Sequence, residues 1–239
     1  MYLKEEKSMN KENGILKDNE FISQELKNNL GLNNSPIAIK LVFYKEEISK
    51  EFERIDRKAR HCEMVKEASL GKKFYAISED QSCKGGSAVL GLEDIPIKIE
   101  TGEFYYKLGR FKTVGSGKRT MDRVPKIDSK IFAILYSPLE LANFQADIII
   151  MITNPKQGML VSQAIVYTLG GRVEANFAGI QSVCGDAVAG PYTTKNPNIT
   201  LACSGSRKFA KFNDSELIIG LNGENIGCTV TALNLMKKD

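Results

Sequence analysis

The chain has 239 residues and a formal net charge of +4, and 42% of its residues are hydrophobic and 26% are charged. This length and composition are typical of a globular protein with a sizeable core, and they exclude the fibrous and disordered classes. The longest strongly apolar stretch, residues 146–153, is far shorter than the ~20 residues of a membrane-spanning helix. Because the N-terminus is charged where a secretory signal would be apolar, we expect a cytoplasmic protein without a membrane partner.

Lysine, arginine and acidic residues are mixed along most of the chain, which is typical of a solvated surface. Cations are denser at residues 118–123 and 207–211. Neither segment has the run of interleaved aromatic residues and cations that binds single-stranded nucleic acid, so we expect no nucleic-acid partner. Either segment could hold the phosphate or carboxylate of a small ligand.

The order of predicted elements indicates a flexible N-terminal tail at residues 1–12 and one domain at residues 13–239. Apolar residues at helical spacing and small-residue runs predict helices at residues 14–30, 60–70, from about 85, 104–124 (broken at glycines 109 and 115–117), 155–169 and 224–236. Alternating or β-branched apolar runs predict extended segments at residues 36–43, 74–77, 131–136, 147–152, 172–179, 198–203 and 216–221.

Helices and strands are mixed without a regular strand–helix–strand repeat. The connection between the segments at 131–136 and 147–152 is too short for a full crossover helix. We therefore predict an α+β fold built on a mixed, mostly antiparallel sheet with flanking helices.

The chain has five cysteines and a single histidine, His61. Thiols stay reduced in the cytoplasm, and an odd number of cysteines cannot all pair, so we expect no disulfide framework. Any multidentate metal site must use mainly thiolates or carboxylates, because one imidazole is too few for a histidine-based site.

Three cysteines, Cys83, Cys184 and Cys203, lie where a strand or loop gives way to small residues. At such a position the sulfur can approach backbone N–H groups at a helix N-terminus, which favours the thiolate. Cys62 begins a predicted helix beside Arg60 and His61, an environment that also favours the thiolate. The fifth, Cys228, lies in an apolar C-terminal helix, where cysteine usually serves as a small hydrophobe.

Four candidate thiolates match the ligand number of a structural zinc site and of an iron–sulfur cluster. Zinc sites usually contain two closely spaced cysteine pairs, which this chain lacks, whereas dispersed cysteines in glycine-rich loops favour an iron–sulfur cluster. Two alternatives stay open. The cysteines could be core residues of a fold with many tight turns, or one could be a catalytic thiol with His61 as base or with Asp186 beside Cys184.

The same cysteines occur in sequence blocks that resemble the family of the domain of unknown function 169. The resemblance covers residues 35–221 and is carried by the blocks SPIAIKL, RHCEMVKEASLGKKFY, DQSCKGGSAVLGL, TGEFYYKLGRF, AILYSPLELANFQADIIIMITNPKQGM, GGRVEANFAGIQSVCGDAVAGPYTTKNPNITLACSGSRKFA and ELIIGL. It implies a single-domain cytoplasmic protein, common among anaerobes, and it imports no biochemical activity. An anaerobic setting favours iron–sulfur over zinc, since a partly exposed cluster survives there.

These observations lead to the hypothesis of an iron–sulfur protein that binds one [4Fe–4S] cluster. Its ligands would be Cys62, Cys83, Cys184 and Cys203. The N–H groups of Gly85, Gly185 and Gly205 would bond the cluster sulfides, and Arg207 or Lys208 would offset the negative charge.

The cluster would serve electron transfer, sensing, or chemistry on a small anionic ligand, which would meet Arg119, Arg207 or Lys208. The alternative functions are a metal-free module that binds a small molecule, a thiol-dependent enzyme, and a structural partner in a larger assembly. Several apolar strands also lead us to expect a homo-oligomer.

Overall fold

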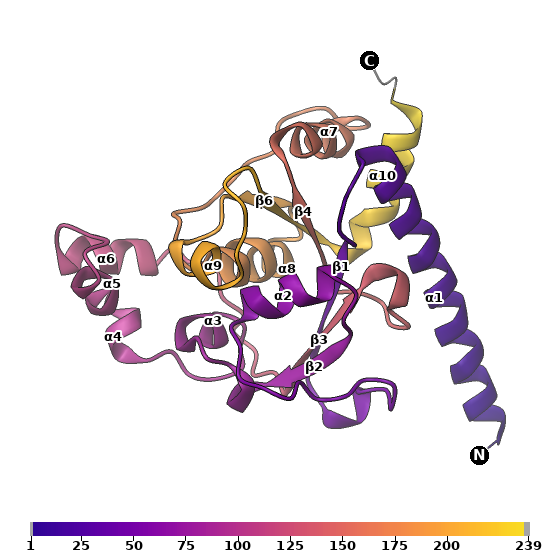
Figure 1. Cartoon of the computed structure of the whole chain (residues 1–239), viewed down its shortest axis with the longest axis horizontal. Coiled ribbons are helices and arrows are strands. Elements are labelled where there is room, and N and C mark those ends of the chain that lie inside the picture. The colour runs from indigo at the N-terminus through magenta and orange to yellow at the C-terminus, as the bar shows by residue number, and fades with distance from the viewer. Residues whose placement is uncertain (1, 237–239) are drawn as a thin grey trace.

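One open sheet forms the centre of the protein (Figure 1). The computed structural model describes residues 2–236, and their side chains from residue 14 onward. Over these residues the sheet has six strands in the order β2-β3-β1-β4-β6-β5, and neighbouring strands are antiparallel throughout. The strands are β1 (Ile37–Val42), β2 (Phe74–Ile77), β3 (Ala133–Pro138), β4 (Ile148–Thr153), β5 (Asn198–Thr200) and β6 (Leu217–Asn222). The α+β prediction is confirmed.

Both faces of the sheet are apolar and covered. Alternate residues of each central strand point to opposite sides, so each strand contributes side chains to both faces. In β4, Ile148, Ile150 and Ile152 join one hydrophobic cluster, and Ile149 and Met151 join the other. The central strands therefore lie between two apolar layers.

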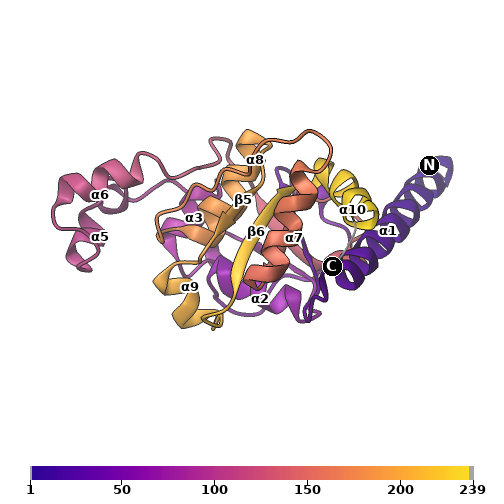
Figure 2. The same cartoon turned by 90° about the horizontal axis from the view of Figure 1, so that it is seen from above.

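A different set of helices covers each face of the sheet (Figure 2). The first face carries α2 (His61–Ser69), α3 (Lys84–Val89), a π-helix η4 (Ser182–Ala189), α8 (Gly190–Thr194) and α9 (Ser204–Phe209). The second carries α1 (Tyr2–Leu30), α7 (Pro155–Val166) and α10 (Ile226–Leu235). Short 3-10 helices are η1 (Lys45–Glu47), η2 (Ser78–Asp80), η3 (Leu139–Leu141) and η5 (Gly223–Asn225). No helix in residues 2–236 is both long and apolar enough to cross a membrane.

A lobe extends from one side of the sheet and consists of α4 (Ile97–Glu100), α5 (Glu103–Lys107) and α6 (Val114–Met121) (Figures 1 and 2). Its small core contains Ile99 and Met121, and it packs against Ile180. The predicted helix break at residues 115–117 is wrong, because α6 runs through these glycines from a cap in which the Thr113 hydroxyl accepts the Ser116 N–H. We call α4–α6 the helical lobe.

Other segments also differ from the sequence predictions. Residues 172–179 form no strand, because the Asn198 side chain, rather than a neighbouring strand, hydrogen-bonds both the N–H and the carbonyl of Asn176. Helix α1 starts at Tyr2 and so includes residues 2–12, where the sequence predicted a flexible tail.

The sequence did not predict the helical segment at η4, which packs directly against the backbone of β6. A Cβ added at Gly220 of β6 would lie 1.9 Å from the Ala187 carbonyl oxygen, so only glycine permits this approach. Gln181, immediately before η4, has a positive φ of 52°. Every residue of η4, including Cys184, is buried.

Candidate metal centre

Four helices on the first face of the sheet each carry one cysteine at or near their first residue. Cys62 is the second residue of α2, and Cys184 is the third residue of η4. Cys83 and Cys203 are the N-cap residues of α3 and α9. Cys62 and Cys184 are buried, whereas Cys83 and Cys203 are half-buried. We call these four residues the four-cysteine site.

Cys83 and Cys184 form one half of the site, and both of their sulfurs face Gly86 of α3. A Cβ added at Gly86 would lie 3.6 Å from both sulfurs. A methyl group at residue 86 would therefore be in ordinary van der Waals contact with both thiols. Sequence analysis had singled out the neighbouring glycine, Gly85, which instead lies against Gln181 and the Tyr105 hydroxyl.

Cys203 and Cys62 form the other half and share Ser206. The Ser206 hydroxyl lies 3.2 Å from Cys203 Sγ, and the Ser206 N–H donates to the same sulfur at 3.4 Å. Ser206 also acts on the thiol of Cys62, whose pKa it lowers against the larger effect of burial. A Cβ added at Gly205 would lie 3.7 Å from Cys203 Sγ.

Electrostatic interactions join the two halves. Burial raises the pKa of Cys184 well above its usual value, and the neighbouring cysteines Cys83, Cys203 and Cys62 raise it further. Burial likewise raises the pKa of Cys62 to about 12, and Cys203 and Cys83 again contribute. Cys62 and Cys184 are therefore neutral near pH 7, and a positively charged ligand would be needed to ionise them.

The fifth cysteine lies elsewhere. Cys228 is exposed on α10, which covers the second face of the sheet. The part of the chain that the structure describes contains no group of three or more His, Cys, Asp or Glu side chains that could hold a metal ion.

Tyr105, from the helical lobe, lies beside the four-cysteine site, and sequence analysis did not identify it. Burial raises the pKa of its phenol, and Cys184, Cys83 and Cys203 also raise it. The signal in the sequence is weak, since Tyr105 is one of two adjacent tyrosines in a short helix. The lobe thus supplies a neutral hydroxyl next to the thiols.

Gly185 and Arg207 have structural partners of their own. The Gly185 N–H donates to the Gln181 carbonyl at 2.8 Å. The Arg207 guanidinium donates to the carbonyls of Leu201, Asn213 and Glu216. Arg207 therefore holds together the loop that carries Cys203.

His61 is not directed at a cysteine by any contact of the described residues. Its Nδ1 lies 2.8 Å from the Tyr136 hydroxyl of β3. Burial lowers the pKa of His61 to about 3, so the imidazole is neutral near pH 7. This geometry gives no support to a thiol enzyme that uses His61 as its base.

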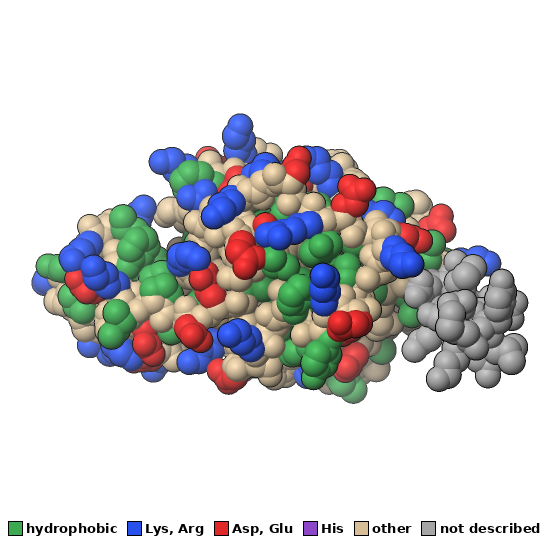
Figure 3. Space-filling model, turned by 90° about the horizontal axis from the view of Figure 1, so that it is seen from below, with side chains coloured by type: hydrophobic (Ala, Val, Ile, Leu, Met, Phe, Trp, Pro, Cys, Tyr) green, Lys and Arg blue, Asp and Glu red, His purple; other side chains and the backbone are tan. Residues whose placement is uncertain are grey.

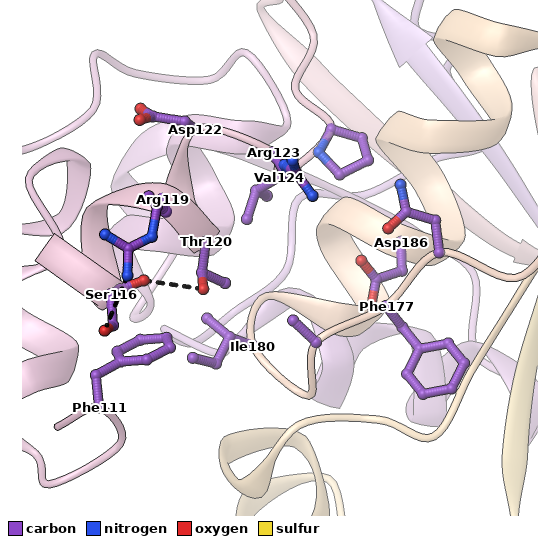
Figure 4. A pocket seen from close by; sticks show the side chains of 13 residues that line it. Phe111, Ser116, Arg119, Thr120, Asp122, Arg123, Val124, Phe177, Ile180 and Asp186 are labelled. Atoms are coloured by element: carbon purple, nitrogen blue, oxygen red, sulfur yellow. Dashed lines mark hydrogen bonds between the residues drawn. The ribbon is translucent and has the colours of Figure 1, made fainter.

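A cavity of about 700 Å³ lies between α6 and the segment from residue 176 to η4 (Figure 4). It is lined by Phe111, Ser116, Arg119, Thr120, Asp122, Arg123, Val124, Pro125, Asn176, Phe177, Ala178, Ile180 and Asp186. Asp186 accepts a hydrogen bond from the Thr200 hydroxyl at 2.9 Å, and burial raises its pKa to about 7. Of the two cation-rich segments that the sequence analysis offered to a ligand, residues 118–123 line this cavity through Arg119 and Arg123, whereas Arg207 and Lys208 do not line it.

Residues 25–232 match the model of the domain of unknown function 169 family, described as "Uncharacterised ArCR". The chain belongs to this family. It is also 42% identical, over 199 residues, to an uncharacterised protein of Methanocaldococcus jannaschii, and the similarity covers 82% of this chain and 85% of that protein. No solved structure matches the chain.

The part that matches the domain of unknown function 169 family contains the whole four-cysteine site, Tyr105 and the lining of the cavity. It also includes Cys228, which lies beyond the blocks in which the resemblance was noticed. Family membership is thus confirmed, and the functions of these residues rest on their geometry.

Proposed function

We propose that the four-cysteine site binds one [4Fe–4S] cluster. The convergence of Cys62, Cys83, Cys184 and Cys203 from four separate helices supports this proposal. Four thiolates are the full ligand set of such a cluster, and two of these four are buried, which protects a cluster from solvent. The neutral thiols would lose their protons as the cluster binds.

The dispersal of the cysteines over four helices favours a cluster over a zinc ion. Tetrahedral zinc with Zn–S bonds of about 2.3 Å draws its four sulfurs to about 3.8 Å from one another. The described residues provide no group that could hold a single ion in this way, although their thiols interact electrostatically. A cube of four irons and four sulfides is larger and holds its cysteine ligands further apart.

The surroundings of the site suit an electron-transfer, sensing or ligand-binding cluster. The N–H and hydroxyl of Ser206 would stabilise the negative charge on the cluster's thiolates, and such hydrogen bonds tune reduction potential. Half-buried Cys83 and Cys203 would leave one edge of the cluster accessible. We place this chemistry in the reducing cytoplasm, where the thiols stay free.

Metal analysis of cysteine variants tests the proposal. The protein is purified without oxygen, and iron, sulfide and the absorbance near 400 nm, roughly where thiolate-ligated clusters absorb, are measured. We expect about four irons per chain, and loss of most iron in each of the four single cysteine-to-alanine variants. Cys228→Ala is the matched control and should keep its iron, while circular dichroism verifies folding. Equal iron in Cys83→Ala and the unmodified protein would contradict the proposal.

The cavity favours a second candidate, a metal-free module that binds a small molecule. Its volume of about 700 Å³ is within the range of roughly 300–1,000 Å³ that is common for ligand sites. A colourless protein without iron or zinc that still binds a ligand would support this candidate over the first.

We also propose that the protein self-associates through the helical lobe. Ile97, Phe104 and Leu108 are 71%, 44% and 55% exposed there. Figure 3 shows apolar side chains on this lobe, at the left of the view, among lysines and arginines. Light scattering at increasing protein concentration, with Ile97→Ser and Leu108→Ser as variants, tests the proposal, which a monomer at all concentrations would overturn.

A further inference from the structure

The cavity beside the helical lobe has a positively charged wall. Arg119 is in the last turn of α6, and Arg123 follows two residues after the end of that helix. Neither arginine forms an ion pair within the described residues, whereas Asp122 between them is paired with Lys118. Arg119 is held by the Ser116 hydroxyl at 3.3 Å. Two unpaired guanidinium groups on one wall match a carboxylate or phosphate group.

The floor of the cavity is apolar. Phe111 and Phe177 line it from opposite sides, and Ile180 lies between them (Figure 4). Phe177 is 42% exposed, so its ring contributes apolar surface that the fold itself does not cover. A planar or apolar body would bury this surface.

The wall opposite the arginines is polar and comes from η4 and the segment before it. The Asp186 carboxylate of η4 accepts a hydrogen bond from the Thr200 hydroxyl, and the Asn198 side chain bonds the backbone N–H and carbonyl of Asn176. The Asp186 side chain and the Asn176 backbone therefore have fixed partners, so the wall is organised before a ligand binds. A ligand hydroxyl or amine directed toward Asp186 could donate a hydrogen bond to it.

We propose that this cavity binds a small organic anion, with its carboxylate or phosphate on Arg119 and Arg123 and a planar apolar body against Phe111, Phe177 and Ile180. This inference extends the proposed function by naming the class of its ligand. Its test needs no iron, so that failure here and failure of the cluster proposal are distinguishable.

The same cavity adjoins the four-cysteine site through η4. Asp186 lines the cavity, and Cys184 is two residues earlier in that helix. Val124 lines the cavity as well, and its Cγ1 would lie 3.1 Å from a Cβ at Gly185. A bound ligand would therefore contact the elements that position Cys184.

Calorimetric titration of the protein as purified tests the proposal with defined probes. Phenyl phosphate carries a phosphate on a phenyl ring, and benzoate carries a carboxylate on a phenyl ring. Benzyl alcohol has the ring without the charge, and inorganic phosphate has the charge without the ring. We expect either aromatic anion to bind at least about tenfold more tightly than benzyl alcohol and inorganic phosphate. The stronger of the two then distinguishes a phosphate ligand from a carboxylate ligand.

Variants locate the binding. The double variant Arg119→Gln and Arg123→Gln should bind the aromatic anion about tenfold or more weakly than the unmodified protein. Lys50→Gln, which removes a charge from an exposed residue outside the cavity, should leave binding unchanged. Phe177→Ala should weaken the binding of phenyl phosphate and leave the binding of inorganic phosphate unchanged. Equal binding to the double variant, or equal affinity for inorganic and phenyl phosphate, would overturn the proposal.

Discussion

The sulfurs of Cys83 and Cys184 face the same α-carbon, that of Gly86, and a methyl group added there would lie 3.6 Å from each. These cysteines are about one hundred residues apart in the chain, and the contact between α3 and η4 brings them together. The distance to Gly86 is an ordinary van der Waals contact, so a methyl group fits the folded protein. It would nevertheless occupy space between two proposed cluster ligands.

Gly86→Ala should therefore reduce iron loading without unfolding the protein. Alanine in place of glycine inside a helix is favourable by about 1 kcal/mol, so α3 should not weaken. We expect at least about a twofold loss of iron, because the added methyl group displaces ligands that must hold a defined geometry. Gly227→Ala in α10 is the matched control, since a Cβ there meets nothing within 4 Å. Full iron content in Gly86→Ala would show that the cluster does not use this space.

Ser206→Ala tests the hydrogen bonds at the other half of the site, where Ser206 contacts Cys203. The variant keeps the backbone N–H on Cys203 but loses the hydroxyl at 3.2 Å from its sulfur. A hydrogen bond to thiolate stabilises the more negative, reduced cluster, so its loss should lower the reduction potential. A loss of about 1 kcal/mol corresponds to about 40 mV for a one-electron couple. Redox titration followed by electron paramagnetic resonance measures the shift, and Ser162→Ala in α7 is the control.

Arg207→Lys separates two roles of this arginine. Lysine keeps the charge but cannot reach the carbonyls of Leu201, Asn213 and Glu216 together, because it lacks the planar fork. If loop geometry matters, the variant should lose about 2 kcal/mol of unfolding free energy and part of its iron. Lys208→Gln, which removes the adjacent charge, should change both quantities little. The reverse pattern, with iron kept in Arg207→Lys and lost in Lys208→Gln, would favour a purely electrostatic role.

Local patterns predicted the observed strands and α7 well, since their signals lie within the segments, but they also predicted a strand at residues 172–179 that does not form. Buried β-branched runs mark β1 and β4, and Asn154 followed by Pro155 marks the start of α7. The π-helix η4 depends instead on Gly220, a distant residue, and on the contact that it permits with Ala187. No local pattern encodes such a contact.

In the candidate site, too, local patterns predicted some features, whereas others depend on contacts between distant segments. Small residues after each cysteine pointed to Cys83, Cys184 and Cys203, and the structure brings these thiols and Cys62 together. Their pairing across Gly86 and Ser206, and the presence of Tyr105, follow from how helices pack on the sheet. Their role as cluster ligands stays a prediction.

Glu140→Gln should destabilise the protein at neutral pH, because Glu140 joins helix α1 to η3. Lys27 and Ser23 of α1 donate to its carboxylate at 2.6 Å and 2.7 Å, and Ser35 donates as well. Burial raises the pKa of Glu140, but these hydrogen bonds outweigh burial and hold the pKa below its usual value. We expect a loss of about 1–2 kcal/mol in unfolding free energy at pH 7.

The pH dependence of that loss has a definite sign. A carboxyl whose pKa is lower in the folded protein stabilises it fully above the unfolded-state pKa, and that stabilisation disappears as pH falls through the folded-state pKa. The difference between Glu140→Gln and the unmodified protein should therefore be largest near neutrality and shrink in acid. Urea unfolding over a series of pH values measures it, with Glu79→Gln, an exposed carboxylate, as control. A difference that stays constant down to acid pH would mean that the carboxylate charge does not hold α1 in place.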